Sequence, residues 1–192
     1  MENFFELDTL FKIEIYNFQI LENTFHIMDA ASKMECDIKL LSKSICTTNI
    51  EGNNKFNYIR MAKCADSVII RKNQNNNLDL HIIELKKDIH DKDLDKLYWQ
   101  FLGAYMRVMS VLVAYSQVDN IDFYLISDKK INTSNIINIA QGTNQKKNKN
   151  YNRTLFDENK IKNQYHFNIY PFNLKTLNIT KYNLQDSTDI VI

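Results

Sequence analysis

Three residues near the middle of the chain carry side chains that could carry out hydrolysis together. Asp66 precedes a short polar stretch, and Glu84 and Lys86 follow it. Two carboxylates can hold a hard divalent cation such as Mg²⁺, which takes oxygen ligands and keeps several of its waters. A neighbouring ammonium can orient or deprotonate an attacking water and neutralise charge on a phosphate in the transition state. These residue types suit metal-dependent hydrolysis of a phosphate ester.

The segments that carry these residues are predicted to form a β-hairpin. Residues 67–71 are rich in β-branched side chains, the Asn-rich run 72–77 suits a turn, and residues 78–86 are mostly apolar. Because side chains alternate along a strand, Glu84 and Lys86 point to the same face. That face also carries Leu80 and Ile82, and the other carries His81, Ile83 and Leu85. An antiparallel hairpin would bring Asp66 beside Glu84.

Asp66 followed, after a hairpin, by Glu84-Leu85-Lys86 resembles the motif of the PD-(D/E)XK, or restriction-endonuclease-like, nuclease superfamily, with Ala65 in the usual place of Pro. The wider strings at 63–66 and 83–88 are also similar to small bacterial proteins of this superfamily. The resemblance implies an α/β fold with a restriction-endonuclease-like central mixed sheet flanked by helices. It also implies Mg²⁺ or Mn²⁺ held by Asp66, Glu84 and the Leu85 carbonyl, with Lys86 assisting the nucleophile.

A long helix is predicted after Lys86, over about 88–115. Its apolar face comprises Leu94, Leu97, Tyr98, Phe101, Tyr105, Val108 and Leu112. An adjacent line at helical spacing comprises Lys92, Lys96, Gln100, Gly103 and Arg107. In one interpretation this line faces the scissile phosphate, with Gln100 near the metal and with Lys96 and Arg107 in contact with the nucleic acid. In the other interpretation it is a solvated flank of the helix. Gln100 resembles the helical Gln of the RecB-like branch, although Tyr105 lies one position beyond the Tyr of that pattern.

Upstream of the hairpin we expect one helix with an apolar face, and the pattern at the start of the chain leaves two alternatives open. Residues 2–25 fit either a helix followed by a strand or one long helix, and residues 29–45 show an apolar face with Asp29 as N-cap. Nucleases of this type often bring a further Glu to the metal. Glu35 on the flank of that helix and Glu51 in a loop over 47–54 are candidates, and a surface carboxylate is the alternative for both. Residues 55–64 could form a strand, with Lys63 available for a phosphate.

Downstream, residues 120–127 are predicted to form a strand that a helical crossover places parallel to a neighbour. A short helix could follow at 132–140. The run 145–153 is locally basic, and its Lys146, Lys147, Lys149, Tyr151 and Arg153 could contact nucleic acid, with Tyr151 stacking on a base. A solvated loop is the alternative. Residues 165–172 alternate like a strand that stops at Pro171, and a short strand plus tail could end the chain.

The composition suits one globular domain. We assign residues 1–192 to a single domain with its core at about 28–172. The net charge is +1, from 24 basic and 23 acidic residues, so phosphate binding would need a local patch. The three cysteines lack the paired spacing of a zinc site. We expect a cytoplasmic location because no signal peptide or membrane-spanning run is evident.

The expected function is a metal-dependent nuclease that hydrolyses phosphodiester bonds, with DNA favoured as substrate and a role in defence, restriction or repair implied only by the resemblance. The partner is then nucleic acid and not a membrane. The resemblance also allows a homodimer, because nucleases of this class often dimerise to cut two strands. The alternative is an inactive nuclease-fold module that binds a protein or nucleic acid, in which Asp66, Glu84 and Lys86 form a structural ion pair.

Overall fold

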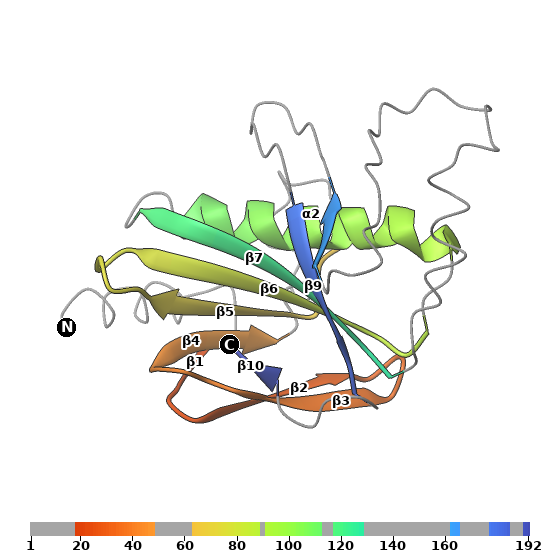
Figure 1. Cartoon of the computed structure of the whole chain (residues 1–192), viewed down its shortest axis with the longest axis horizontal. Coiled ribbons are helices and arrows are strands. Elements are labelled where there is room, and N and C mark those ends of the chain that lie inside the picture. Colours follow the sequence, from red (N-terminus) through yellow and green to blue (C-terminus); the bar gives the residue numbers. More distant parts are fainter. Residues whose placement is uncertain are drawn as a thin grey trace.

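The computed structural model describes residues 18–48, 63–88, 91–112, 117–128, 162–165, 177–184 and 190–192 (Figure 1). In chain order, the elements in these ranges are β1 (Phe18–Leu21), β2 (Thr24–Asp29), β3 (Met34–Lys39), β4 (Ser44–Thr48), β5 (Ser67–Lys72), β6 (Leu78–Lys86), α2 (Asp91–Leu112), β7 (Val118–Ser127), β8 (Lys162–Tyr165), β9 (Leu177–Asn183) and β10 (Ile190–Val191). Strands predominate, and with α2 they give an α/β architecture.

Two sheets are present in the described part of the chain. The larger has seven strands in the order β1-β4-β5-β6-β7-β9-β8, and the smaller has three in the order β10-β3-β2. In the larger sheet, β4, β5 and β6 form an antiparallel meander. α2 then connects β6 to β7, which pairs with β6 in parallel, as the sequence predicts for residues 120–127. β9 continues the sheet parallel to β7.

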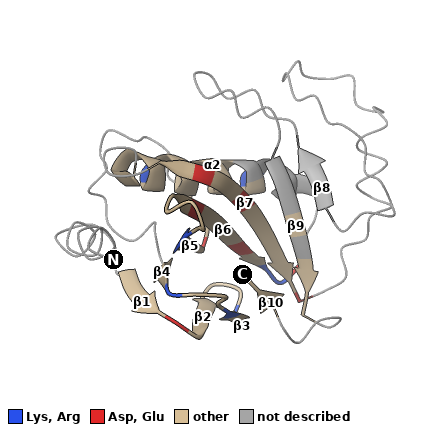
Figure 2. Ribbon diagram, turned by 60° about the vertical axis from the view of Figure 1, so that its left-hand side comes forward, with Lys and Arg blue, Asp and Glu red and all other residues tan. Residues whose placement is uncertain are grey.

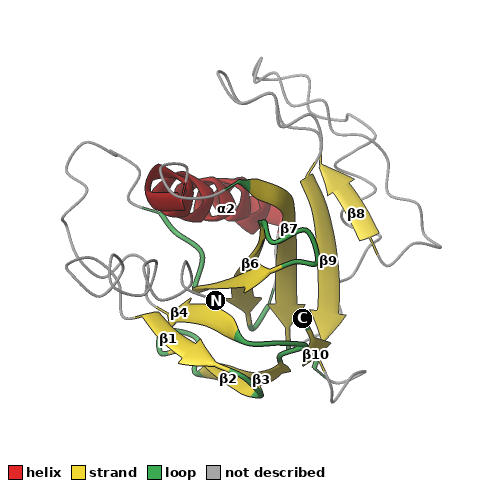
Figure 3. Ribbon diagram, turned by 90° about the vertical axis from the view of Figure 1, so that its left-hand side faces the viewer, coloured by secondary structure: helices red, strands yellow, loops and turns green. Residues whose placement is uncertain are grey.

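α2 covers one face of the larger sheet and the β10-β3-β2 sheet covers the other (Figure 1 and Figure 3). The central strand β6 is buried on both sides because its side chains alternate between the two layers. Leu80 and Ile82 pack in the cluster that contains α2, whereas Ile83 and Leu85 pack with β2 and β3. Glu84 therefore belongs to the face that α2 covers.

The prediction of a helix over residues 29–45 is wrong. This region forms the end of β2, a turn, β3 and the start of β4. The Asp29 carboxylate accepts hydrogen bonds from the backbone N–H groups of Ala31 and Ser32, at 3.0 and 3.3 Å, so it stabilises a hairpin turn and not a helix end. Along β3 the residues are alternately buried and exposed. A spacing of four residues fits both a helix and one face of a strand, and here it belongs to a strand.

The predicted hairpin is confirmed. β5 and β6 pair antiparallel, from Ser67 opposite Ile83 to Lys72 opposite Leu78. In the turn between them, the Asn73 side-chain oxygen accepts hydrogen bonds from the N–H groups of Asn75 and Asn77. Asn76 adopts a φ of 68°, a conformation that Asn tolerates better than most residues. The Asn-rich run thus folds as its side chains predict.

The remaining predictions meet the structure only in part. One long helix over 2–25 is wrong for the described residues, because β1 and the start of β2 lie there; residues 1–17 are outside the described ranges. Residues 63–65 form no strand, and the rest of the predicted strand 55–64 is not described. The helix predicted at 132–140 and the basic run 145–153 also lie outside the described residues.

At the C-terminal end, β8 stops at Tyr165, where the predicted strand 165–172 was to begin, and residues 166–172 are not described. The short strand predicted near the chain end corresponds to β10. In the described ranges, no helix combines the length and apolar character needed to cross a membrane.

Candidate functional site

Asp66 lies immediately before β5, next to the strand that carries Glu84. Because Ser67 pairs with Ile83, the hairpin register sets Asp66 across from Glu84. The Asp66 carboxylate accepts a hydrogen bond from the Leu85 backbone N–H at 2.7 Å through its Oδ2 atom. A backbone donor is fixed by the sheet, so this bond also fixes the orientation of the carboxylate. The predicted proximity of Asp66 and Glu84 is confirmed.

Glu84 is completely buried, which is rare for a carboxylate. The Lys86 ammonium, on the same face of β6, donates a hydrogen bond to Glu84 Oε1. The second oxygen, Oε2, is buried and has no hydrogen-bond partner among the described residues. An unsatisfied buried polar atom costs about 1–3 kcal/mol, and more when it is charged. The site therefore contains a buried carboxyl oxygen to which none of the described residues donates a hydrogen bond.

The electrostatics of the site follow from this burial. Burial and, to a smaller extent, the Asp66 charge raise the pKa of Glu84 to about 8, although Lys86 and a hydrogen bond with the Asp66 backbone act in the opposite direction. For Lys86, burial alone would lower the pKa, but the charges of Glu84, Asp66 and Asp29 outweigh it and the net shift is upward. Lys86 is thus held as an ammonium. Two carboxyl groups therefore lie close together beside the Lys86 ammonium.

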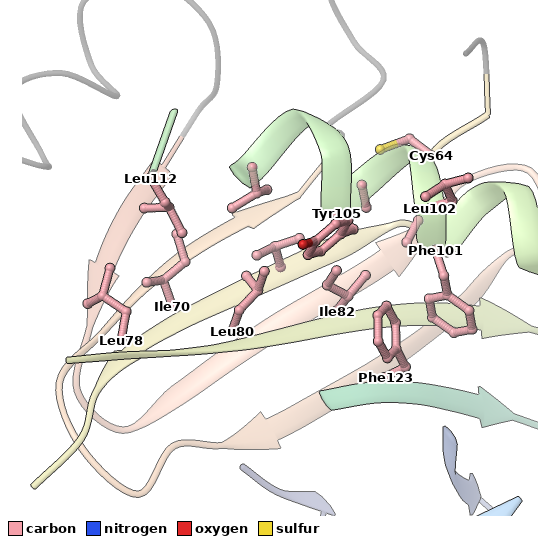
Figure 4. Close-up of a cluster of buried hydrophobic side chains, with 14 of the residues drawn as sticks. Cys64, Ile70, Leu78, Leu80, Ile82, Phe101, Leu102, Tyr105, Leu112 and Phe123 are labelled. Carbon is pink, nitrogen blue, oxygen red and sulfur yellow. The ribbon is translucent and has the colours of Figure 1, made fainter. Parts of the chain in front are cut away.

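α2 brings Gln100 to the same end of the sheet. The helix runs back along β6, so Leu112 lies near Leu78 and Tyr105 near Leu80 (Figure 4). Phe101 meets Phe123 edge to face, with ring centroids 5.2 Å apart, at the level of Ile82. Gln100 directly precedes Phe101, so it lies near the level of Ile82, on the side of Phe101 toward the Glu84 end of the strand. Gln100 Oε1 is buried and has no hydrogen-bond partner among the described residues.

The line of residues around Gln100 is not a solvated flank throughout. Lys96 is exposed, but Arg107 is buried, and Gly103 packs closely against the Lys63 backbone. Of the predicted phosphate-binding residues, Lys63 and Lys96 are exposed and Arg107 is not. A buried Arg107 side chain is a poor candidate for direct contact with nucleic acid.

Of the two upstream candidates, Glu35 is not brought to the site. It points outward from β3, with 69% of its side chain exposed, and its carboxylate lies 4.0 Å from His26 Nε2. The surface alternative therefore holds for Glu35. Glu51 is outside the described ranges, as are Lys146, Lys147, Lys149, Tyr151 and Arg153, so their roles stay predictions.

Asp29 is a neighbour of the site that the sequence pattern did not predict. The tip of the β2-β3 hairpin carries this carboxylate near enough to Lys86 to raise its pKa. Assigning residues 29–45 to a helix concealed this, because only a strand pairing places the hairpin tip over the end of β6. Acidic and basic residues are otherwise interspersed over the described sheets and helix (Figure 2), in line with the near-neutral net charge.

Asp66, Glu84 and Lys86 together carry a net charge of −1 when all three are ionised. A dication between the carboxylates would change this to +1, which complements one phosphodiester group. The described residues contain no group of three or more His, Cys, Asp or Glu side chains arranged to hold a metal. A metal here would rest on two carboxylates, with carbonyl oxygens and water completing its shell. Comparison with protein-family models, curated proteins and solved structures finds no match to this chain.

Proposed function

We propose that this protein is a metal-dependent nuclease that hydrolyses phosphodiester bonds, with DNA as the favoured substrate. The observation that carries the proposal is Glu84, fully buried beside Asp66 with one carboxyl oxygen that accepts no hydrogen bond from the described residues. Such an atom is stabilised by a cation, and Mg²⁺ and Mn²⁺ accept carboxylate oxygens as ligands. The donor set fits either ion.

Each residue has a distinct task in this proposal. Asp66 and Glu84 hold the ion, and the Leu85 carbonyl is a third candidate ligand. When bound, the ion supplies a water of lowered pKa and polarises the phosphate. Lys86, kept as an ammonium by its acidic neighbours, contacts the water or a phosphate oxygen, where it neutralises developing charge. The Gln100 amide orients the same water or a second phosphate oxygen.

The topology is compatible with this assignment. A meander of three antiparallel strands, a crossover helix and a parallel strand place the acidic residues on the hairpin and Gln100 on the helix. This arrangement supports a restriction-endonuclease-like core, which we include in the proposal. Lys63 and Lys96 are exposed and remain candidates for contact with the nucleic-acid backbone.

A second reading is favoured by one observation, the hydrogen bond between Lys86 and Glu84. If this bond is purely structural, the chain is an inactive nuclease-fold module that binds a protein or nucleic acid. Divalent cations discriminate between the two readings. For an inactive module, Mg²⁺ and Mn²⁺ neither raise the melting temperature nor support cleavage of any nucleic acid.

A cleavage assay tests the proposal. Wild type, Glu84→Gln and Lys86→Ala are compared on circular and linear duplex DNA, single-stranded DNA and RNA, with Mg²⁺, Mn²⁺ or EDTA. We expect metal-dependent cleavage by wild type and a loss of about 10²-fold or more in each variant, the size of effect typical for removing one transition-state contact. Glu35→Gln, which alters an exposed carboxylate away from the site, should cleave normally. Wild-type rates in both Glu84→Gln and Lys86→Ala would end the proposal.

A further inference from the structure

Gly103 lies at the middle of α2, where another part of the chain passes very close. A Cβ atom placed on this residue would be 1.9 Å from the Lys63 carbonyl oxygen and 3.1 Å from its carbonyl carbon. Side-chain carbons essentially never approach a neighbour below 3.0 Å, so any substitution would force the two segments apart by about 1 Å or more. The atoms in the way are backbone, which cannot rotate aside as the end of a side chain can.

The segment that touches Gly103 leads directly to the candidate site. After Lys63 the chain passes through Cys64 and Ala65, which are 2% and 1% exposed and belong to the core cluster beneath α2. The next residue is Asp66, whose carboxylate accepts the Leu85 N–H. We call residues 63–65 the crossing segment. It is held at one end by the contact of Lys63 with α2 and at the other by the hydrogen bond between Asp66 and β6.

We infer that Gly103 is a positioning residue of the candidate site, because the absence of a side chain lets the Lys63 backbone lie against α2 and so sets Asp66 beside Glu84. This inference rests on the proposed function for its catalytic meaning. The sequence pattern places Gly103 on a line of residues that could face the scissile phosphate, but Gly103 has no side chain that could contact phosphate or metal. It acts through Asp66.

A side chain at position 103 would displace the crossing segment more readily than the helix. α2 is anchored in the core by Phe101, Ala104 and Val108, all fully buried. Residues 63–65 lie outside any helix or strand. Asp66 would therefore move relative to Glu84. Misplacing a reacting group by about 1 Å can cost about 10²-fold in rate.

The Leu85 amide proton reports on this geometry without any need for metal or substrate. Its hydrogen bond to a carboxylate is short and charge-assisted, so its NMR resonance should lie downfield and exchange slowly. In Gly103→Ala we expect this resonance to move upfield and to exchange faster. Val108→Ala removes buried methyl groups from the same helix away from the crossing, and should leave the resonance in place. A folded Gly103→Ala protein with the wild-type Leu85 resonance would overturn the inference.

If Gly103→Ala does not fold, Ala65→Gly decides the question. This change adds chain freedom between the Gly103 contact and Asp66 without introducing a clash. We expect the same upfield movement of the Leu85 resonance, and an unchanged resonance would refute the positioning role. Asp66→Asn identifies the contribution of the carboxylate charge to the signal.

Cleavage kinetics separate this inference from the proposed function. In whichever of Gly103→Ala and Ala65→Gly folds, we expect kcat to fall about 10²-fold with KM little changed, because the geometry of the reacting groups is altered and substrate contact is not. Val108→Ala should retain kcat at temperatures where it is folded. Wild-type protein that cleaves nothing would refute the nuclease proposal, while the Leu85 resonance would still decide whether Gly103 positions Asp66.

Discussion

Acid is expected to destabilise this protein through His81, which lies on the face of β6 opposite Glu84. The ring is only 3% exposed, with Nδ1 3.2 Å from the Tyr124 hydroxyl and 3.6 Å from an Asp122 oxygen. Burial, and then the Arg71 charge, lower its pKa from 6.5 to about 4, although Asp79 acts in the opposite direction. His81 is therefore neutral in the folded protein under conditions in which the unfolded chain would already be protonated.

The sign and size of the effect follow from this difference. The stability associated with neutral His81 is complete above pH 6.5 and is lost as the pH falls toward 4, because only the unfolded chain binds the proton in that window. At about 1.4 kcal/mol per pKa unit, the full loss is about 3 kcal/mol, of which about 2 kcal/mol has occurred by pH 5. For a chain of this size, the loss of about 2 kcal/mol by pH 5 corresponds to a His81 contribution of about 4–8 °C to the decrease in Tm.

Urea denaturation of wild type and His81→Gln between pH 7.5 and 4.5 measures this effect. The raised pKa of Glu84 changes stability in the opposite sense but is common to both proteins, so the difference between them isolates His81. Wild type should lose about 2 kcal/mol more than the variant on going to pH 5. Equal losses in the two proteins would refute the assignment of His81 as a buried neutral imidazole.

Three further predictions concern packing and reactivity. Phe101→Ala removes a fully buried ring that packs from α2 onto Phe123, so it should lower the free energy of unfolding by about 3–5 kcal/mol in urea titrations. A loss below about 1 kcal/mol would contradict the buried position of this ring. Asp29→Ala should cost about 1 kcal/mol by the same measurement through loss of the turn hydrogen bonds, whereas Asp29→Asn should retain most of the stability. Cys36 and Cys46 are buried with pKa values raised to about 12, so both thiols should resist a thiol reagent in the native protein and react on unfolding.

The hairpin and the long helix were predictable because local signals agree with the final fold. β-Branched residues, an Asn-rich turn and an apolar run specify β5 and β6, and strand alternation alone puts Glu84 and Lys86 on one face. The apolar periodicity that predicts α2 corresponds to residues buried in the core, such as Phe101 and Val108. In both places the local pattern has a single interpretation.

The hairpin of β2 and β3 was missed because its pattern has two interpretations. Ala30, Met34 and Ile38 recur every four residues, which fits a helical face and equally one face of a strand. Cys36, buried between Met34 and Ile38, decides for the strand, but its burial comes from packing against β6. The contact of Gly103 with Lys63 was beyond prediction for a similar reason, since it joins residues 40 positions apart.

The most direct test of the account is calorimetric titration of the protein with Mn²⁺, using wild type, Glu84→Gln and Glu35→Gln. We predict binding by wild type and by Glu35→Gln, whose altered side chain is on the surface, and loss of that binding in Glu84→Gln, which lacks the buried carboxyl group that would ionise on binding the cation. Undiminished binding by Glu84→Gln, or no binding by wild type, would contradict the claim that Asp66 and Glu84 form a cation site.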